Sequence, residues 1–398
     1  MQDKLRWHQT EKGNRDKAMA GEPAAALMAR NTFPTRWAEI VERMQGVQPE
    51  AYARSRNFVD GKVTRLSPYL SRGVISTKDV LDSLLARGLS WNQVEKLVQE
   101  LGWREYFQRV WQHFGKGIDE DIRHPQPGVR HHGMPIAIQQ GETGIEGIDQ
   151  GIESLLKDGY MHNHQRMYTA ALACNIAHAH WKQSARWMYY HLLDGDWASN
   201  ALSWQWVAGS FSNKTYVANQ ENINRYTGTH QRGTFLDTDY ESLADLSIPE
   251  VLRPHGIPAL DTQLALTPLP LINPELPVMV YTYYNLDPRW HADEKANRIL
   301  LLEPSHLQAY PVSRRCLKFA AELGKNIPDL QVFCGEFSEL QAITGVAPIH
   351  FKEHPVNRHF RGKEEARDWM CPGVSGYTPS FSGWWKQAEP KLRALFKP

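Results

Sequence analysis

The feature that most constrains the fold is a long helical pattern in the first half of the chain. The run WNQVEKLVQELGWREYFQRVWQHFG, residues 91–115, repeats apolar residues three and four positions apart for about seven turns. Shorter helical patterns lie on both sides of it. One begins at a capping residue in STKDVLDSLLARG and closes on Gly88, and another is divided near Gly159. Residues 32–231 are therefore expected to be mainly helical.

The pattern changes in the second half of the chain. Residues 236–276 are rich in proline and show no periodicity, which is typical of a linker. Beyond them, short apolar runs such as VMVYTYYNL and NRILLLEP alternate with helical runs such as PVSRRCLKFAAELGK. This alternation predicts an α/β unit with a mainly parallel sheet. The expected fold class is a mainly α-helical domain at 31–235, preceded by a flexible arm at 1–30, and a smaller C-terminal α/β domain at 277–398.

Composition excludes little beyond this. A length of 398 residues favours two domains. A net charge of +1 is too small for nucleic-acid binding by bulk charge, but it is compatible with a local basic groove. The four cysteines are far apart, without a CxxC pair or metal-ligand spacing, so we expect reduced thiols, a cytoplasmic location and no metal site. The polar N-terminal sequence indicates no signal peptide, and no apolar run has membrane-spanning length.

The long helix carries an unusual set of side chains on one face. Its spacing places Glu100, Trp103, Arg104, Phe107 and Trp111 on the same side. One interpretation is an ordinary amphipathic helix in which Glu100 and Arg104 form an i,i+4 salt bridge. The other is a functional face, because a carboxylate, an arginine and large aromatic residues seldom share the face of a core helix.

A second polar stretch, LLDGDWASNALSWQW at residues 192–206, favours the functional interpretation. Asp194 and Asp196 are expected to close a helix that ends in YYHLLDGD. A buried carboxylate needs a partner, and Arg166 is a candidate partner for Asp194. The two aspartates could bind a metal ion, but the residues that follow are not a typical set of ligands for a hard cation.

Four motifs together resemble a known family. RLSPYLSRG, ELGWREYF, GYMHNHQRM and DGDWASNALSWQW stand in the order and at spacings similar to those of the helical FAD-binding domain of DNA photolyases and cryptochromes. The resemblance covers roughly residues 35–230 and implies that the chain binds FAD. Members of this family usually begin with an α/β antenna-binding domain, whereas here the α/β segment follows the helical one. The antenna chromophore is therefore left unassigned.

The resemblance also implies which residues contact the cofactor. Asp194 would pair with Arg166 beside the flavin, and Asp196 would accept a hydrogen bond from the isoalloxazine imide. Asn200 would lie opposite the flavin N5. The remaining cofactor contacts that the resemblance implies are Tyr52, Thr64, Leu66, Ser67, Arg104 and Asn163.

Other positions match residues that handle the substrate and the electron. Glu100 and Trp103 match the residues that hydrogen-bond and stack on a cyclobutane pyrimidine dimer, and the glutamate favours this lesion over the 6-4 class. Met167 and Trp206 are also expected to face the lesion. Electrons would reach FAD through the catalytic pathway residues Trp204 and Trp181. The usual outer tryptophan has no counterpart between Trp111 and Trp181, and its candidate substitutes are Trp187, Tyr189 and Tyr160.

The chain departs from the family pattern at several positions. Val63 and Thr64 stand where Thr-Ser is usual, and Ala201 and Leu202 replace smaller or polar residues. His164 replaces an arginine that contacts the lesion phosphate, which predicts weaker binding to DNA.

The predicted function is light-driven repair of cyclobutane pyrimidine dimers in DNA, by electron transfer from photoexcited reduced FAD to a dimer flipped out of the duplex. Two alternatives stay open. One is a cryptochrome-like blue-light photosensor that signals to a protein partner without repair. The other is a helical, aromatic-rich binding module without a cofactor, for which four motif matches would have to be accidental.

Overall fold

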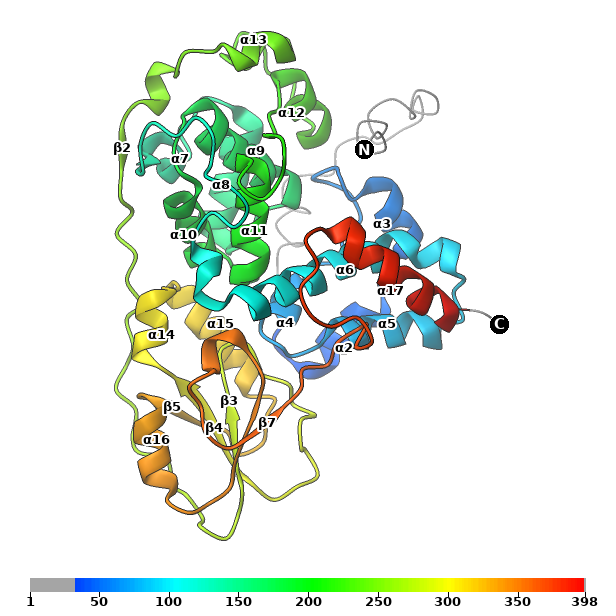
Figure 1. The fold of residues 1–398 in the computed structure, drawn as a ribbon, viewed down its shortest axis with the longest axis vertical. Coiled ribbons are helices and arrows are strands. Elements are labelled where there is room, and N and C mark those ends of the chain that lie inside the picture. The colour runs from blue at the N-terminus through cyan, green and yellow to red at the C-terminus, as the bar shows by residue number, and fades with distance from the viewer. Residues whose placement is uncertain (1–32, 397–398) are drawn as a thin grey trace. The chain divides into compact units, whose positions relative to one another are not determined.

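The computed structural model describes residues 33–396, so the arm predicted at 1–30 lies outside the described residues. The first two thirds of the described chain are helical (Figure 1). The α-helices of this region are α2 (Trp37–Gln45), α3 (Pro49–Ser55), α4 (Ser67–Ser71), α5 (Thr77–Ala86), α6 (Trp91–Phe114), α7 (Ile136–Gln140), α8 (Glu146–Asp158), α9 (Asn163–Ala171), α10 (Trp181–His191), α11 (Trp197–Ala208), α12 (Gln220–Thr227) and α13 (Tyr240–Ala244). Short 3-10 or π turns lie at η2 (Gly115–Asp119), η3 (Leu172–Ile176) and η4 (Glu250–Leu252).

Local sequence explains where several of these helices begin and end. Ser76 caps α5 in a capping box with Asp79, whose carboxylate accepts from the Ser76 backbone N–H. Helix α6 runs for 24 residues without interruption, as its apolar repeat predicts. Gly159 ends α8 in a left-handed conformation (φ 73°) that glycine adopts without strain, so the predicted division there is confirmed.

The turn between α10 and α11 differs from the prediction. Helix α10 ends at His191, and Asp196 is instead the N-cap of α11, where its Oδ1 accepts from the Ser199 backbone N–H at 2.7 Å. Aspartate is among the favoured N-cap residues because its carboxylate satisfies an amide that has no partner within the helix. The expectation that both aspartates close the preceding helix is therefore wrong.

The C-terminal region is built on one five-stranded sheet. Its strands are β3 (Val278–Tyr281), β4 (Asn297–Leu302), β5 (Gln331–Cys334), β6 (Ile349–Lys352) and β7 (Lys363–Glu365), and its helices are α14 (Pro304–Ala309), α15 (Arg314–Gly324) and α16 (Phe337–Thr344). The spatial order is β5-β4-β3-β6-β7 and every neighbouring pair is parallel. The predicted fold class, mainly α-helical with a smaller α/β part, is confirmed.

The strand order reverses between β3 and β6, so the loops that follow these two strands leave in opposite directions. A cavity of about 110 Å³ lies there, lined by residues of both regions that include Asp196, Tyr284 and His354. In open parallel sheets such a reversal forms a crevice at the carboxyl ends of the strands. The helical and α/β regions thus meet around this crevice.

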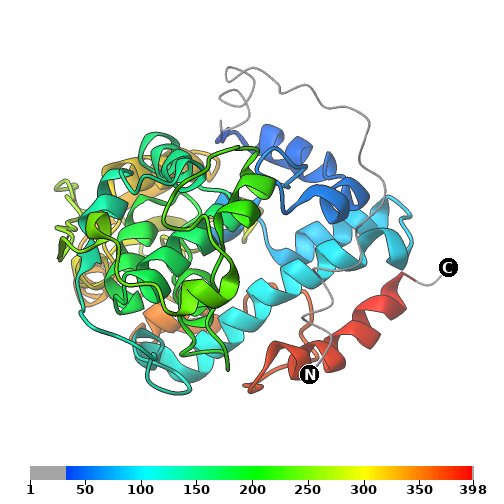
Figure 2. The same cartoon turned by 90° about the horizontal axis from the view of Figure 1, so that it is seen from above.

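Two further contacts bring later segments of the chain back against the helical region. Strand β1 (Met134–Pro135) pairs antiparallel with β2 (His255–Gly256), which carries part of the proline-rich segment along the helices. Helix α17 (Phe381–Leu395) lies beside α6, as the views in Figures 1 and 2 agree. A Cβ at Gly102 would lie 3.0 Å from the rings of Trp384 and Trp385, closer than ordinary van der Waals contact, so glycine favours this approach.

The return of the chain to α6 was not expected from the sequence. A buried carboxylate secures it, because Glu105 accepts from the backbone N–H groups of Met370 at 2.7 Å and Cys371 at 2.9 Å.

The boundaries predicted for the domains and the linker stay predictions. Within residues 33–396, no helix combines the length and apolar character that crossing a membrane requires.

Candidate functional site

The strongest polar feature of the helical region is a buried ion pair between α9 and the turn before α11. Arg166 Nη2 donates to both carboxylate oxygens of Asp194, at 3.0 and 2.8 Å, and Arg166 Nε donates to the Met161 carbonyl at 2.8 Å. The Asp194 side chain is only 4 % exposed. This is the partner predicted for Asp194.

Helix α4 holds the same turn in place from the other side. Ser71 Oγ donates to the Asp194 carbonyl at 2.8 Å, and the guanidinium of Arg72 donates to the Gly195 carbonyl. Arg72 is fully buried and its guanidinium lies 3.7 Å from the ring centre of Tyr283. Two of the motifs quoted above, RLSPYLSRG and DGDWASN, are therefore joined by hydrogen bonds.

Asp196 forms a second buried centre of charge. Its Oδ2 accepts from Gln108 Nε2 at 2.6 Å and lies 3.3 Å from Arg104 Nη2. The Asp196 side chain is 3 % exposed, so both contacts offset the cost of burying its charge. Helix α6 thus places two polar side chains against the start of α11.

The salt bridge that an ordinary amphipathic α6 would form between Glu100 and Arg104 is not made. Arg104 faces Asp196, whereas Glu100 Oε1 lies 2.8 Å from Lys96 and 3.5 Å from Arg56 on α3. A buried carboxylate needs compensation more than the Glu100 carboxylate, which is 33 % exposed. The Glu100–Arg104 pairing is therefore wrong, and Glu100 forms its i,i+4 pair with Lys96 instead.

Cationic groups gather around Tyr160 and His162. The Arg65 and Arg166 guanidinium carbons lie 5.1 and 5.7 Å from the Tyr160 ring centre. Burial, followed by His164 and Arg166, lowers the pKa of His162 to about 3, so its imidazole is neutral at physiological pH. Arg65 has a positive φ of 53°, which is uncommon for a residue with a side chain and turns the chain into α4.

The other predicted cofactor residues lie as follows. Tyr52 is close to Glu100, Arg56 and Tyr160, and burial followed by the charge of Glu100 raises its pKa. Asn200 is buried and its amide nitrogen donates to the Ala185 carbonyl at 2.8 Å.

Four more of them belong to the loop before α4, to the first residue of α4 and to α9. Leu66 is buried and Ser67 begins α4, while Thr64 lines an open cavity of about 540 Å³. Asn163 contacts the predicted lesion residue Met167, with its amide nitrogen 3.8 Å from Sδ.

The two tryptophans predicted to stack on the lesion each have another aromatic ring packed beside them. Trp103 stacks on Phe381 of α17, with ring centres 3.7 Å apart and an angle of 13° between the rings. Trp206 lies beside Tyr216, with ring centres 6.0 Å apart. The cover over Trp103 comes from a helix that the sequence did not predict.

Trp181 and Trp204, the residues predicted to carry electrons, are both buried, and the sequence analysis missed one neighbour of Trp181. Trp181 lies 6.4 Å from Trp197 between ring centres, and Trp197 lies 5.5 Å from Tyr189 and 5.6 Å from Tyr310. Trp204 is 2 % exposed. Trp197 stands in the motif DGDWASN itself, so its place in the sequence was a signal that could have been used.

Comparison with known proteins finds matches to the helical region of the chain. Residues 97–268 match the model of the FAD binding domain of DNA photolyase. A deoxyribodipyrimidine photo-lyase of Alkalihalophilus pseudofirmus is 32 % identical over 165 residues, which is 39 % of this chain and 34 % of the relative. One of Streptomyces griseus is 31 % identical over 148 residues, or 37 % of this chain and 32 % of the relative. The chain therefore spans about a third of the length of these relatives.

Among solved structures, the Synechocystis sp. PCC6803 cryptochrome is similar, with a TM-score of 0.42 and 22 % identity over 48 % of this chain and 42 % of that one. The helical region of this chain is thus similar to the DNA photolyases. FAD is the cofactor of this domain.

The residues present suit that cofactor. A dinucleotide carries two phosphates, and the Arg65 guanidinium provides positive charge near the predicted site, whereas Arg104 and Arg166 are paired with Asp196 and Asp194. The buried amide of Asn200 and the carboxylates of Asp194 and Asp196 are polar groups suited to the edge of an isoalloxazine ring.

Proposed function

We propose that this protein repairs cyclobutane pyrimidine dimers in DNA in a light-driven reaction that depends on FAD. The observation that supports the proposal most is the arrangement of α6. This helix carries the predicted lesion residues Glu100 and Trp103, and about one and two turns after Glu100 it carries Arg104 and Gln108, which contact Asp196. One rigid element therefore connects the residues predicted to hold the lesion with those predicted to hold the flavin.

When bound, FAD would supply the light-excited electron that opens the dimer. The chain's own residues would orient the two reactants. Arg166 fixes Asp194, and Arg104 and Gln108 fix Asp196, so neither carboxylate can turn away from the site. Glu100, held between Lys96 and Arg56, would accept hydrogen bonds from the polar edge of the flipped bases.

Electron supply to the flavin would use the buried tryptophans. Trp204 and Trp181 are the predicted members of the pathway, and the structure supports Trp197 as the next member because of its 6.4 Å ring separation from Trp181. Trp197→Phe should slow photoreduction of the flavin in the presence of a thiol donor, whereas Trp187→Phe should not. A photoreduction rate equal to that of the wild type in the Trp197→Phe variant would exclude Trp197 from the pathway.

The repair proposal is tested on Glu100. Glu100→Gln should lower the yield of dimer repair under blue light by about ten- to a hundredfold, because a hydrogen bond to a buried polar edge contributes roughly 1–3 kcal/mol. The matched control is Glu95→Gln, which changes an exposed glutamate on the same helix. Flavin absorption should be the same in both variants. If Glu100→Gln repairs as well as the control, Glu100 does not contact the lesion.

A photosensor is the second candidate, and one observation favours it. Phe381 covers Trp103, so a flipped dimer could stack there only after α17 moves. In a sensor, light would change the flavin and loosen α17, making it available to a protein partner. Hydrogen exchange of residues 381–395 should then increase on illumination without DNA. In a repair enzyme, exchange of this segment should instead increase on addition of dimer-containing DNA in the dark.

A further inference from the structure

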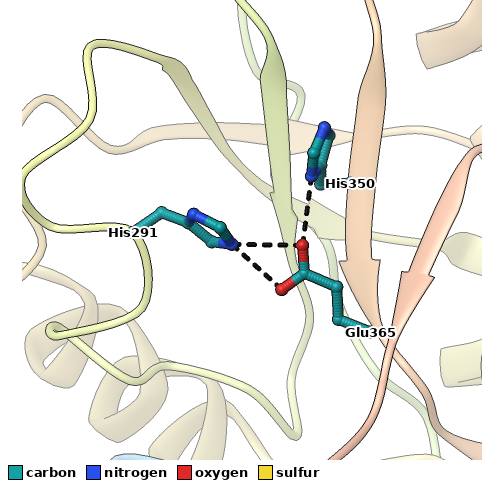
Figure 3. Close-up of side chains that lie close together, drawn as sticks. All are labelled: His291, His350 and Glu365. Carbon is teal, nitrogen blue, oxygen red and sulfur yellow. Dashed lines mark hydrogen bonds and ion pairs between the residues drawn. The ribbon is translucent and has the colours of Figure 1, made fainter.

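Two histidines and a glutamate converge at the edge of the sheet (Figure 3). His291 Nε2 lies 3.1 and 2.9 Å from the two carboxylate oxygens of Glu365, and His350 Nδ1 lies 3.1 Å from Glu365 Oε1. The three ligand atoms fall within 4.8 Å of one another. Across residues 33–396, this is the only group of three or more histidine, cysteine or acidic side chains with such spacing.

The fold brings these residues together from three separate segments. His350 lies on β6 and Glu365 on the adjacent strand β7, which pair in parallel. His291 lies in the connection between β3 and β4. Figure 3 shows its ring pointing toward the Glu365 carboxylate from the side opposite β7. Sequence separations of 15 and 74 residues explain why no spacing motif announced the cluster.

We propose that His291, His350 and Glu365 bind one divalent transition-metal ion of the zinc class. Two imidazoles and a carboxylate are ligands that zinc and neighbouring transition metals prefer, whereas magnesium and calcium prefer oxygen ligands alone. Bonds of about 2.1 Å at a tetrahedral angle would separate ligand atoms by about 3.4 Å. The histidine–glutamate separations of 2.9–3.1 Å need to open by only a few tenths of an ångström, and all three ligand atoms already lie within 4.8 Å of one another.

The surroundings of the cluster match those of metal ligands. The Nδ1 of His291 lies 2.6 Å from Glu294 Oε1, so an N–H there can donate to a carboxylate and direct Nε2 toward the metal. Metal-bound histidines commonly have such a carboxylate partner. The Trp290 indole N–H donates to Glu365 Oε2 at 2.9 Å and holds that carboxylate in place.

The backbone of the β3–β4 connection is also held in an uncommon shape at the cluster. His291 has a φ of 50°, and Arg298 Nη2 donates to the carbonyls of His291 at 2.7 Å and Glu294 at 2.8 Å. A residue with a side chain adopts this conformation at a cost that the surrounding contacts must offset. Arg298 thus holds this connection in the conformation in which the His291 imidazole faces the edge of the sheet.

The cluster is accessible to a metal ion from solvent. The side chains of His291, His350 and Glu365 are 20 %, 16 % and 21 % exposed. Lys363 Nζ lies 3.6 Å from Glu365 Oε1, but this lysine is 64 % exposed and can turn into solvent. Three protein ligands would leave a further coordination position for water or a small ligand, as in catalytic rather than structural zinc sites.

The test uses the full-length protein after removal of metals with a chelator. Calorimetric titration with Zn²⁺ should show one saturable site per chain, and Co²⁺ should give the visible absorption of a histidine-bound ion. Mg²⁺ should not compete. Glu365→Gln and His350→Ala should each weaken Zn²⁺ binding at least a hundredfold, and Glu294→Gln should weaken it about ten- to a hundredfold.

The matched control is His359→Ala. His359 Nε2 lies 2.8 Å from Glu303 Oε1, so it belongs to another histidine–glutamate pair of the α/β region. This variant should bind Zn²⁺ as the wild type does. Circular dichroism and flavin content would show that the variants are folded, and neither readout depends on DNA repair. If Glu365→Gln, His350→Ala and Glu294→Gln all bind Zn²⁺ like the wild type, the cluster is a metal-free ion pair.

Discussion

The helical region and the α/β region both gather charged side chains, but they do so at different depths. In the helical region the carboxylates of Asp194 and Asp196 are 4 % and 3 % exposed, and each is held by an arginine. In the α/β region Glu365 is 21 % exposed and is held by two histidines. A buried charge depends on its partner far more than an accessible one does. The same kind of substitution should therefore have unequal effects in the two regions.

The largest effect is expected from Arg166→Ala. It leaves the buried Asp194 carboxylate without its bidentate partner, which should lower the free energy of unfolding by about 3–5 kcal/mol. The flavin should be lost or loosened as well. Chemical denaturation and flavin absorption would measure the two effects. If Arg166→Ala lowers the free energy of unfolding by less than about 1 kcal/mol and keeps full flavin occupancy, buried charges do not depend on their partners more than accessible ones.

A second test uses pH on the same buried region. The pKa of His162 is about 3 in the folded protein, against 6.5 in the unfolded chain, so the unfolded chain binds a proton first as the pH falls. Titration of His162 should therefore leave the free energy of unfolding unchanged above pH 6.5. Between pH 6.5 and about 3, this free energy should fall by up to about 1.4 kcal/mol per pH unit.

The comparison is made with His162→Asn, because asparagine can still cap α9. Urea denaturation at pH 7 and pH 5 should show a smaller loss of stability in the variant than in the wild type. Equal losses would indicate that the imidazole is hydrated and titrates normally.

A smaller effect is expected in the α/β region. In metal-free protein, His350→Ala removes a hydrogen bond to a partly exposed carboxylate and should cost about 1–2 kcal/mol by chemical denaturation. Excess Zn²⁺ should widen the difference from the wild type, because the wild type alone would be stabilised by binding. A metal-free cost as large as that of Arg166→Ala would contradict the contrast between the two regions.

The smallest effect is expected at the surface of the helical region itself. Lys78 and Asp82 form an i,i+4 pair whose side chains are 52 % and 50 % exposed. Lys78→Gln should change the free energy of unfolding by about 0.3–0.5 kcal/mol, and added salt should reduce even that difference. A larger loss of unfolding free energy would mean that burial does not decide how much these ion pairs stabilise the fold.

The features that were predictable are those whose cause is local in sequence. The apolar repeat of α6, the capping residue Ser76 and the break at Gly159 each act within a few residues. The Arg166–Asp194 pair was also predictable, because a buried carboxylate requires a cation and the motifs offered one nearby. Parallel strands followed from the alternation of apolar and helical runs.

The features that were missed depend on contacts between distant segments. Nothing near Trp103 indicates that Phe381, at the far end of the chain, would cover it. The choice of Asp196 rather than Glu100 as the partner of Arg104 depends on how α6 and α11 pack. The His291 cluster depends on the β6–β7 pairing and on the position of the β3–β4 connection.

The most direct test of the account is repair of a defined thymine dimer by the wild-type protein with its flavin reduced. An oligonucleotide that contains one dimer, single- or double-stranded, is mixed with the protein and exposed to blue light or kept in the dark. Recovery of thymine absorbance should occur only in the light, with many dimers repaired per protein. If the flavin is present and reduced but no dimer is repaired in either form of DNA, the repair function is contradicted and the photosensor replaces it.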